Sequence, residues 1–171
     1  VSDFLSIYGV LKRADVAEVT VVAEREGRVE LYPVDLAIEP DTTIAAFDAQ
    51  YPEGADYVVV PAMDPGTDPV IAAWLSAQRA KGTIIVGICN GSRMLSTAGL
   101  LEGRRATAHW NSISELRGKN PTMEWVPDRR YVVDDGVATS TGITANVPAM
   151  LALIEAIGGR EAAERVAADL G

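Results

Sequence analysis

The one cysteine of this chain lies where a nucleophile would be held in reach of a substrate. Cys89 follows an apolar run at residues 83–88 and precedes a helix-like segment at 91–98. Gly87 and Gly91 flank it at two residues on either side, the spacing of a nucleophile elbow, in which a strained strand-to-helix turn projects the side chain above a sheet. The helix N-terminus would favour a thiolate, and backbone N–H groups could hold a developing oxyanion. The alternative is a glycine-rich turn that contains a small buried hydrophobic side chain.

The segments around Cys89 alternate between strand-like and helix-like patterns. Continuous apolar runs at 19–23, 55–60 and 83–88 are typical of buried strands. A helix between Asp68-Pro69 and Lys81-Gly82 follows the second run, because Asp caps helices, Pro suits their first position and Gly ends them. Strands alternating with helices predict an α/β fold with a mostly parallel sheet covered on both faces.

The two ends of the chain depart from this simple alternation. Short strands at 122–126, 131–133 and 137–140 predict a small antiparallel excursion within residues 122–140, and helices at 146–157 and 160–170 follow it. The chain opens with a helix at 1–14, whereas a doubly wound domain normally opens with a buried strand. We therefore expect one domain over residues 1–171, with the first strand missing. Shorter strands at 29–31 and 36–38 and a helix through Gln50, capped by Asp41 or Thr42, complete the prediction.

Composition and charge exclude several classes of function. The chain is 48% apolar and 23% charged, which is ordinary for a soluble globular domain, and no apolar run approaches the roughly 20 residues that span a bilayer. A net charge of −9 argues against binding to nucleic acid or to an anionic membrane by this domain. The basic pairs Lys12-Arg13, Arg104-Arg105 and Arg129-Arg130 are interpreted as solvated surface. One Cys and one His cannot build a structural zinc site, so no metal is expected.

A longer stretch around Cys89 resembles a known family. The elbow Gly87-Ile88-Cys89-Asn90-Gly91 and the later segment AGLLEGRRATAHW, residues 98–110, are similar to motifs of the ThiJ/PfpI family. The resemblance is strongest to the branch of isonitrile hydratases and ligand-sensing domains of AraC-type regulators, which reads Cys-Thr-Gly and then AGLLDGRRATTHW. Residues 129–136 and 140–145 also fit. The resemblance implies a flavodoxin-like three-layer α/β/α sandwich, related to class I glutamine amidotransferases, over nearly the whole chain.

The same resemblance supplies a partner for Cys89. The stretch VSDFLSIYGVL at residues 1–11 is similar to the family segment that carries an acidic residue, which places Asp3 on that acid. A carboxylate and a thiolate in contact repel each other, so the pair is expected to share one proton and to act as nucleophile and acid/base. Considered without the resemblance, Asp3 is more simply the N-cap of the first helix.

Other site residues come from the same motifs, with two departures. Asn90 replaces the family's Thr, whose hydroxyl is proposed to act in isonitrile hydratases, and we predict that its amide still hydrogen-bonds. Ala62-Met63 replaces Gly-Gly at a backbone that lines the oxyanion site, so Met63 is expected to reshape the pocket. Asn90 is therefore predicted as a catalytic residue with Cys89 and Asp3, and Ala62, Met63, Gly91 and His109 form the predicted binding site. His109 is either a functional group or an orienting, packed histidine.

Three functions remain open from the sequence. The first is a small-molecule enzyme without cofactor, in which Cys89 attacks an isonitrile or a reactive aldehyde. The second is a ligand-sensing domain of an AraC-type regulator, and the third is a redox-responsive protein in which Cys89 is oxidised. We expect a homodimer that binds a small molecule. A cytoplasmic location is favoured over a secreted or periplasmic one, although residue 1 is Val.

Overall fold

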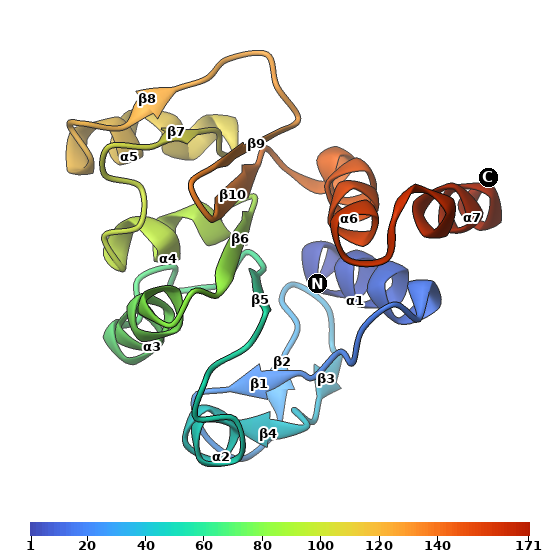
Figure 1. Ribbon diagram of the computed structural model, residues 1–171. Helices are drawn as coiled ribbons and strands as arrows, with labels where there is room; N and C mark the ends of the chain where they lie inside the picture. Colours follow the sequence, from blue (N-terminus) through green and yellow to red (C-terminus); the bar gives the residue numbers. More distant parts are fainter.

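A four-stranded sheet forms the middle layer of the computed structural model, which describes residues 1–171 (Figure 1). Its strand order is β5 (Tyr57–Val60), β6 (Ile84–Ile88), β10 (Val137–Ser140) and β9 (Tyr131–Asp134). β5, β6 and β10 run parallel, and β9 runs antiparallel to β10. The sheet is thus mostly parallel, as predicted. Its inner strand β6 ends at Ile88, and the turn that carries Cys89 follows.

Helices cover both faces of this sheet and give the predicted three layers (Figure 1). On one side lie α1 (Ser2–Ala14), α6 (Ile143–Gly158) and α7 (Arg160–Leu170); on the other lie α3 (Pro69–Ala80), α4 (Gly91–Thr97) and α5 (Ile113–Lys119). Successive side chains of a strand point to opposite faces. Val86 and Ile88 of β6 accordingly pack with the first group of helices, and Ile85 packs with the second.

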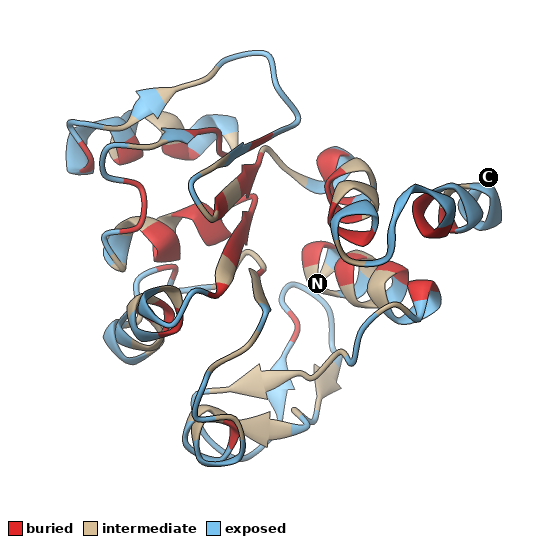
Figure 2. Ribbon diagram, in the orientation of Figure 1, coloured by how far each residue is buried: buried red, intermediate tan, exposed pale blue.

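The buried residues form two clusters, one on each side of the sheet (Figure 2). The cluster under α1, α6 and α7 contains Cys89, together with Ile7, Met150 and Ile154. We call it the α1-side cluster, and its counterpart under α3 and α4 the α3-side cluster. Cys89 therefore belongs to the layer that also holds Asp3.

Short strand pairs lie outside the main sheet. β1 (Val22–Ala23) pairs with β4 (Thr42–Thr43) in parallel, and β2 (Val29–Glu30) pairs with β3 (Ala37–Ile38) in antiparallel. The strand predicted at 19–23 is thus only two residues long and half-buried. No strand of the chain pairs with the outer edge of β5. A strand with a single short partner has few hydrogen bonds to extend it, which explains why β1 is short.

The predicted antiparallel excursion is confirmed for β9 and β10 and is wrong for the segment before them. β8 (Glu124–Trp125) pairs in parallel with β7 (Arg105–Ala106). β10 pairs with β6 as well as β9, so this strand is part of the main sheet. A hairpin pattern in the sequence could not reveal the second partner, because that contact is long-range.

Helix boundaries follow the capping chemistry, with one correction. The Asp68 carboxylate caps α3 by accepting from the N–H groups of Val70 and Ile71 at 2.8 and 3.0 Å, as predicted. α2 (Ile44–Gln50) is capped by the Thr43 hydroxyl rather than by Asp41 or Thr42. None of the helices combines the length and apolar character needed to cross a membrane.

Candidate functional site

Cys89 adopts a backbone conformation that residues other than glycine rarely adopt. Its φ angle is 54°, in the left-handed region, where a side chain is strained unless its surroundings hold it. The Cys89 N–H donates to the Ser140 carbonyl at 3.2 Å, and the Cys89 carbonyl accepts from the Ser92 hydroxyl at 2.8 Å. The predicted strand-to-helix elbow is present, and it is fastened to both β10 and α4.

Gly91 is required because α4 begins against the backbone of β5. A Cβ atom at Gly91 would lie 2.2 Å from the Val60 carbonyl oxygen and 2.9 Å from that of Pro61. Both neighbours are backbone atoms, which cannot rotate away as a side chain can. A side chain here would push α4 from the sheet and displace Cys89. Steric exclusion therefore explains why the residue two positions after the cysteine is a glycine.

Asp3 lies in the first turn of α1 and reaches Cys89. It is 8% exposed, its carboxylate hydrogen-bonds the Cys89 thiol, and its Oδ1 accepts from Asn146 Nδ2 at 3.0 Å. The N-cap of α1 is Val1, and no side chain caps this helix. The interpretation of Asp3 as a helix cap is therefore wrong, and its carboxylate is close enough to Cys89 to act on the pKa of the thiol.

The surroundings of Cys89 favour the thiol rather than the thiolate. Burial, and after it the charge and hydrogen bond of the Asp3 carboxylate, together raise the pKa of Cys89 to about 11, although the Asn90 N–H lowers it. The expectation that the α4 N-terminus would make Cys89 a resting thiolate is thus not supported. Desolvation and a like charge outweigh one backbone N–H and a helix of two turns. Cys89 holds its proton at neutral pH beside a carboxylate that can accept it.

Asn90 contributes mainly through its backbone. Its side-chain Oδ1 accepts from the Ser112 hydroxyl at 2.5 Å, so the amide is engaged away from the sulfur. The Asn90 N–H is the group that hydrogen-bonds Cys89. A backbone donor at this position does not depend on the side chain, so the change from Thr to Asn leaves it intact.

His109 and Cys89 meet across Gly142. A Cβ atom at Gly142 would lie 3.3 Å from His109 Cδ2 and 3.9 Å from Cys89 Sγ. His109 Nδ1 lies 2.7 Å from Asn111 Oδ1 and caps the short helix η1 (Trp110–Ser112). The imidazole is held by its own neighbours and forms no hydrogen bond with Cys89, which agrees with an orienting, packed histidine.

The two residues after Pro61 separate onto different faces. Ala62 packs against the α1-side cluster, which contains Cys89. Met63 packs against the α3-side cluster instead. The Met63 side chain therefore packs on the opposite side of the sheet from the cluster that contains Cys89.

A cavity of about 460 Å³ opens beside His109 and Gly142. We call it the arginine cavity. It is lined by the end of β10 and the start of α6, by the segment after β8, and by the segment around η1; the lining residues are Thr107, Ala108, His109, Trp110, Ile113, Trp125, Asp128, Arg129, Arg130, Thr141, Gly142 and Thr144. Since Gly142 has no side chain, Cys89 Sγ lies directly behind this wall.

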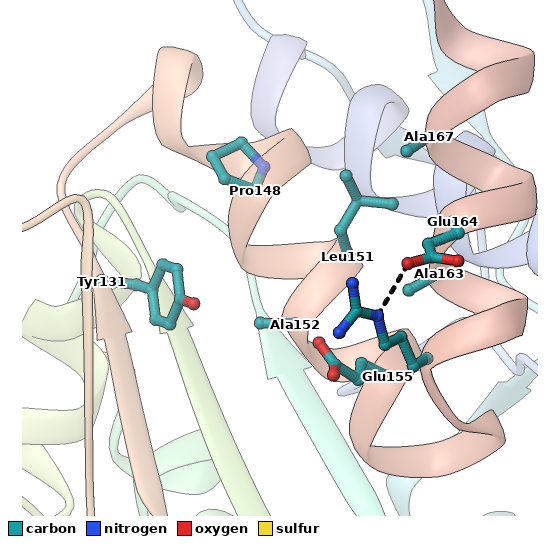
Figure 3. Close-up of a pocket in the computed structure, with 9 residues that line it drawn as sticks. Tyr131, Pro148, Leu151, Ala152, Glu155, Ala163, Glu164 and Ala167 are labelled. Carbon is teal, nitrogen blue, oxygen red and sulfur yellow. Dashed lines mark hydrogen bonds and ion pairs between the residues drawn. The ribbon is translucent and has the colours of Figure 1, made fainter.

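A second cavity of the same volume, about 460 Å³, lies between α6 and α7 (Figure 3). We call it the helix cavity. Leu151, Pro148 and three alanines form its floor, and Tyr131 of β9 faces it across α6. Glu164 on its rim forms an ion pair with Arg160, Nε to Oε1, at 2.7 Å.

Sequence reasoning missed two parts of this site. Asn146, which holds Asp3, was visible as the one amide in the apolar helix pattern ITANVPAMLALI, and such a residue signals a buried polar contact. Arg129 and Arg130 were interpreted as solvated surface, yet they line a cavity. Trp110 and Trp125 line the same cavity, and Trp110 is 78% exposed.

A cysteine elbow with a buried acidic partner, on an α/β/α sandwich, defines a class of protein that the comparisons resolve further. The chain belongs to the DJ-1/PfpI family, whose model matches residues 2–156. It is similar to the HTH-type transcriptional regulator CdhR of Pseudomonas aeruginosa, with 37% identity over 98 residues, which cover 57% of this chain and 29% of the regulator. It is also similar to the isonitrile hydratase of Pseudomonas putida, with 36% identity over 94 residues, 54% of this chain and 40% of the hydratase.

Solved structures agree over nearly the whole chain. The crystal structure of Drosophila melanogaster DJ-1beta matches with a TM-score of 0.86 and 26% identity, covering 99% of this chain and 90% of that one. An AraC family transcriptional regulator from Pseudomonas putida matches with a TM-score of 0.80 and 22% identity, over 99% of this chain and 92% of that one. The second likeness shows the fold alone. The aligned residues span less than half the length of the regulator CdhR and of the hydratase.

Proposed function

We propose that this chain is a cysteine-dependent enzyme that acts on a small electrophilic molecule, with Cys89 as nucleophile and Asp3 as the group that moves its proton. The observation that carries the proposal is the pairing itself. Cys89 has a strained backbone at φ 54°, and its thiol hydrogen-bonds a carboxylate that is 8% exposed. A buried carboxylate with one amide donor and one thiol neighbour is placed to accept a proton.

The proton balance fits the addition of water to an isonitrile. The S–C bond forms as the thiol proton passes to the Asp3 carboxylate and from there to the terminal carbon. The oxygen of water then adds to the same carbon while one of its protons goes to the nitrogen. The C–S bond breaks and the other water proton returns to the sulfur, so a formamide leaves with no change in the protein. An aldehyde carbon would accept the same attack. Similarity to the isonitrile hydratase of Pseudomonas putida supports this substrate class.

A turnover screen tests the proposal. Wild-type protein and Cys89→Ala would be assayed with small isonitriles and 2-oxoaldehydes, the product being followed by NMR. The proposal expects product with the wild type and none with Cys89→Ala. Binding without turnover in both proteins would exclude it.

A ligand-sensing domain is the second candidate, and one observation favours it. A Cys89 pKa of about 11 leaves little thiolate at neutral pH. A binding domain does not need the thiolate, whereas a cysteine enzyme needs Asp3 to take the thiol proton during the reaction. Similarity to the regulator CdhR points the same way. The same high pKa disfavours oxidation of Cys89, since the thiolate is the form that oxidants attack.

We also propose that two copies of the chain associate. Exposed apolar side chains on β9 and α6, Val133 at 61% and Ile143 at 56% exposed, offer surface for a partner. Light scattering at micromolar concentration would then report about twice 18.2 kDa, and a monomer would contradict the proposal.

A further inference from the structure

The arginine cavity contains several polar groups that nothing in the protein uses. Arg129 and Arg130 line it, and neither forms an ion pair, although the chain has 24 acidic residues against 15 basic ones. Ion pairs within 4.0 Å are formed instead by arginines elsewhere, such as Arg79 and Arg104 with Asp135. Two guanidinium groups left free in so acidic a protein are available to an anion.

Thr107 is a second, independent indication. Its residue is 1% exposed, its hydroxyl oxygen has no hydrogen-bond partner in the protein, and it lines the same cavity. Its backbone N–H is satisfied by Thr139 Oγ1 at 2.9 Å, so only the hydroxyl is unused. Six buried side-chain atoms of the protein have no partner, and Thr107 is the one among them whose residue lines this cavity. A ligand bound there could complete its hydrogen bonding.

The start of α6 adds donors on the same wall. α6 runs from Ile143 to Gly158, and its N-cap is Gly142, so no side chain caps its first turn. Thr141, Gly142 and Thr144 line the cavity. The N-terminus of a four-turn helix carries free N–H groups and a partial positive charge, both of which favour an anion.

The remaining lining limits what kind of anion fits. Trp110, Trp125 and Ile113 supply flat apolar surface, and Asp128 is the one acidic residue in the lining. Two arginines against one aspartate leave an excess of positive charge. The volume, about 460 Å³, is that of a small organic molecule rather than of an inorganic ion.

We propose that the arginine cavity binds a small organic acid, whose carboxylate is held by Arg129, Arg130, Thr107 and the N-terminus of α6 and whose apolar part lies against Trp110 and Trp125. This rests on the proposed function only for its consequence, namely that the bound acid presents a reactive carbon toward Cys89 Sγ across the bare backbone of Gly142. A phosphate ester would use the same donors, and the experiment separates the two.

Binding would be measured by isothermal titration calorimetry with benzoate, benzamide and inorganic phosphate, on the wild type and on Cys89→Ala. The inference expects benzoate to bind both proteins at least tenfold more tightly than benzamide, with an affinity that falls as salt rises. Because Cys89→Ala has no nucleophile, binding there is measured independently of any turnover. If the turnover screen were negative but benzoate still bound, the proposed enzymatic function would be excluded and the proposed organic-acid site would stand.

Matched variants locate the site. The double variant Arg129→Gln, Arg130→Gln is expected to weaken benzoate at least tenfold, while Arg160→Gln, which removes an arginine from the helix cavity, leaves it unchanged. Arg129, Arg130 and Arg160 are all exposed, so thermal melts should show that the double variant and Arg160→Gln both fold. Equal loss in the two variants, equal binding of benzoate and benzamide, or binding of phosphate in preference to benzoate would each overturn the proposal.

Discussion

The arginine cavity and the helix cavity have the same volume and share α6 as a wall, yet only one has the character of a binding site. Thr144 lines the first and Pro148, one turn later, lines the second. Arg130 and Tyr131, consecutive in the chain, likewise line different cavities. The two hollows are therefore neighbours in both sequence and space, so the difference between them is a matter of chemistry.

That difference lies in how far the polar groups are already satisfied. In the helix cavity Arg160 is paired with Glu164 at 2.7 Å, and alanine and leucine form the floor (Figure 3). In the arginine cavity two guanidinium groups and the Thr107 hydroxyl have no partner. The volume of a cavity alone does not identify a binding site. Hydrogen-bond donors without a partner in a cavity wall do indicate the kind of ligand that would bind there.

Filling each cavity should give the largest contrast between them. Thr144→Trp would place an indole in the arginine cavity, and Ala152→Trp would place one in the helix cavity. Thr144→Trp is expected to reduce benzoate affinity by about 100-fold, because the ligand and the indole compete for one volume of this size. Ala152→Trp should bind benzoate as the wild type does. If the two variants lose affinity alike, the distinction between the cavities fails.

The next contrast is electrostatic and concerns the sulfur behind Gly142. Asp3→Asn removes a charge and an acceptor that both raise the pKa of Cys89. The pKa therefore falls, and the thiolate fraction at pH 8 rises roughly tenfold for each unit that the pKa drops. Alkylation by iodoacetamide should become faster, by roughly threefold for each unit, because a less basic thiolate is also a weaker nucleophile. In the wild type the rate should keep rising with pH until about 11.

Glu155→Gln is the matched control for Asp3→Asn, since it removes a carboxylate that lines the helix cavity. It should leave the alkylation rate of Cys89 unchanged at every pH. Slower alkylation of Asp3→Asn than of the wild type would mean that the carboxylate assists the thiolate, against the direction of its effect on the pKa.

The elbow was predictable from the sequence because its determinants are local. Gly87, Cys89 and Gly91 lie within five residues, so their spacing is visible in the sequence. The backbone of Val60 and Pro61, which makes a side chain at position 91 impossible, is a distant part of the chain and could not be inferred from that spacing. Asp3 was placed by resemblance alone, because 86 residues separate it from Cys89 and no short-range pattern joins them. The amide that donates to its carboxylate, on Asn146, is 143 residues away.

The arginine cavity was not predictable, and the reason is again the range of the contacts. Its wall joins Thr107, Arg130 and Thr144, which three separate elements supply. Arginine pairs in an acidic chain are usually solvated, and only the folded structure shows that Arg129 and Arg130 line a cavity. The pKa of Cys89 was misjudged for the same reason, because burial depends on α1 and α6 packing over the turn.

A smaller effect is expected from the unused hydroxyl. Thr107→Val keeps the shape of the side chain and removes an oxygen that has no partner. The free energy of unfolding should stay unchanged or rise by up to about 1 kcal/mol, because an unsatisfied buried group no longer has to be desolvated. Benzoate affinity should fall a few-fold in the same variant.

Thr139→Val is the control for that variant, since the Thr139 hydroxyl accepts from the Thr107 N–H at 2.9 Å. Its loss leaves a buried donor unpaired and should cost about 1–3 kcal/mol. Chemical denaturation measures both variants. A Thr107→Val protein that is destabilised as much as Thr139→Val would show that the Thr107 hydroxyl already has a partner.

The smallest effect belongs to the helix cavity and tests whether its ion pair matters at all. Arg160 and Glu164 have side chains that are 81% and 63% exposed, and they are spaced four residues apart on α7. An exposed pair of this kind contributes about 0.3–0.5 kcal/mol to stability, and salt screens it. Arg160→Ala should therefore change the free energy of unfolding by less than about 0.5 kcal/mol, and the change should vanish in 1 M NaCl. A loss of several kcal/mol that persists in salt would mean that α7 depends on this pair for its packing on α6. The ion pair on the rim of the helix cavity would then contribute to the stability of the fold.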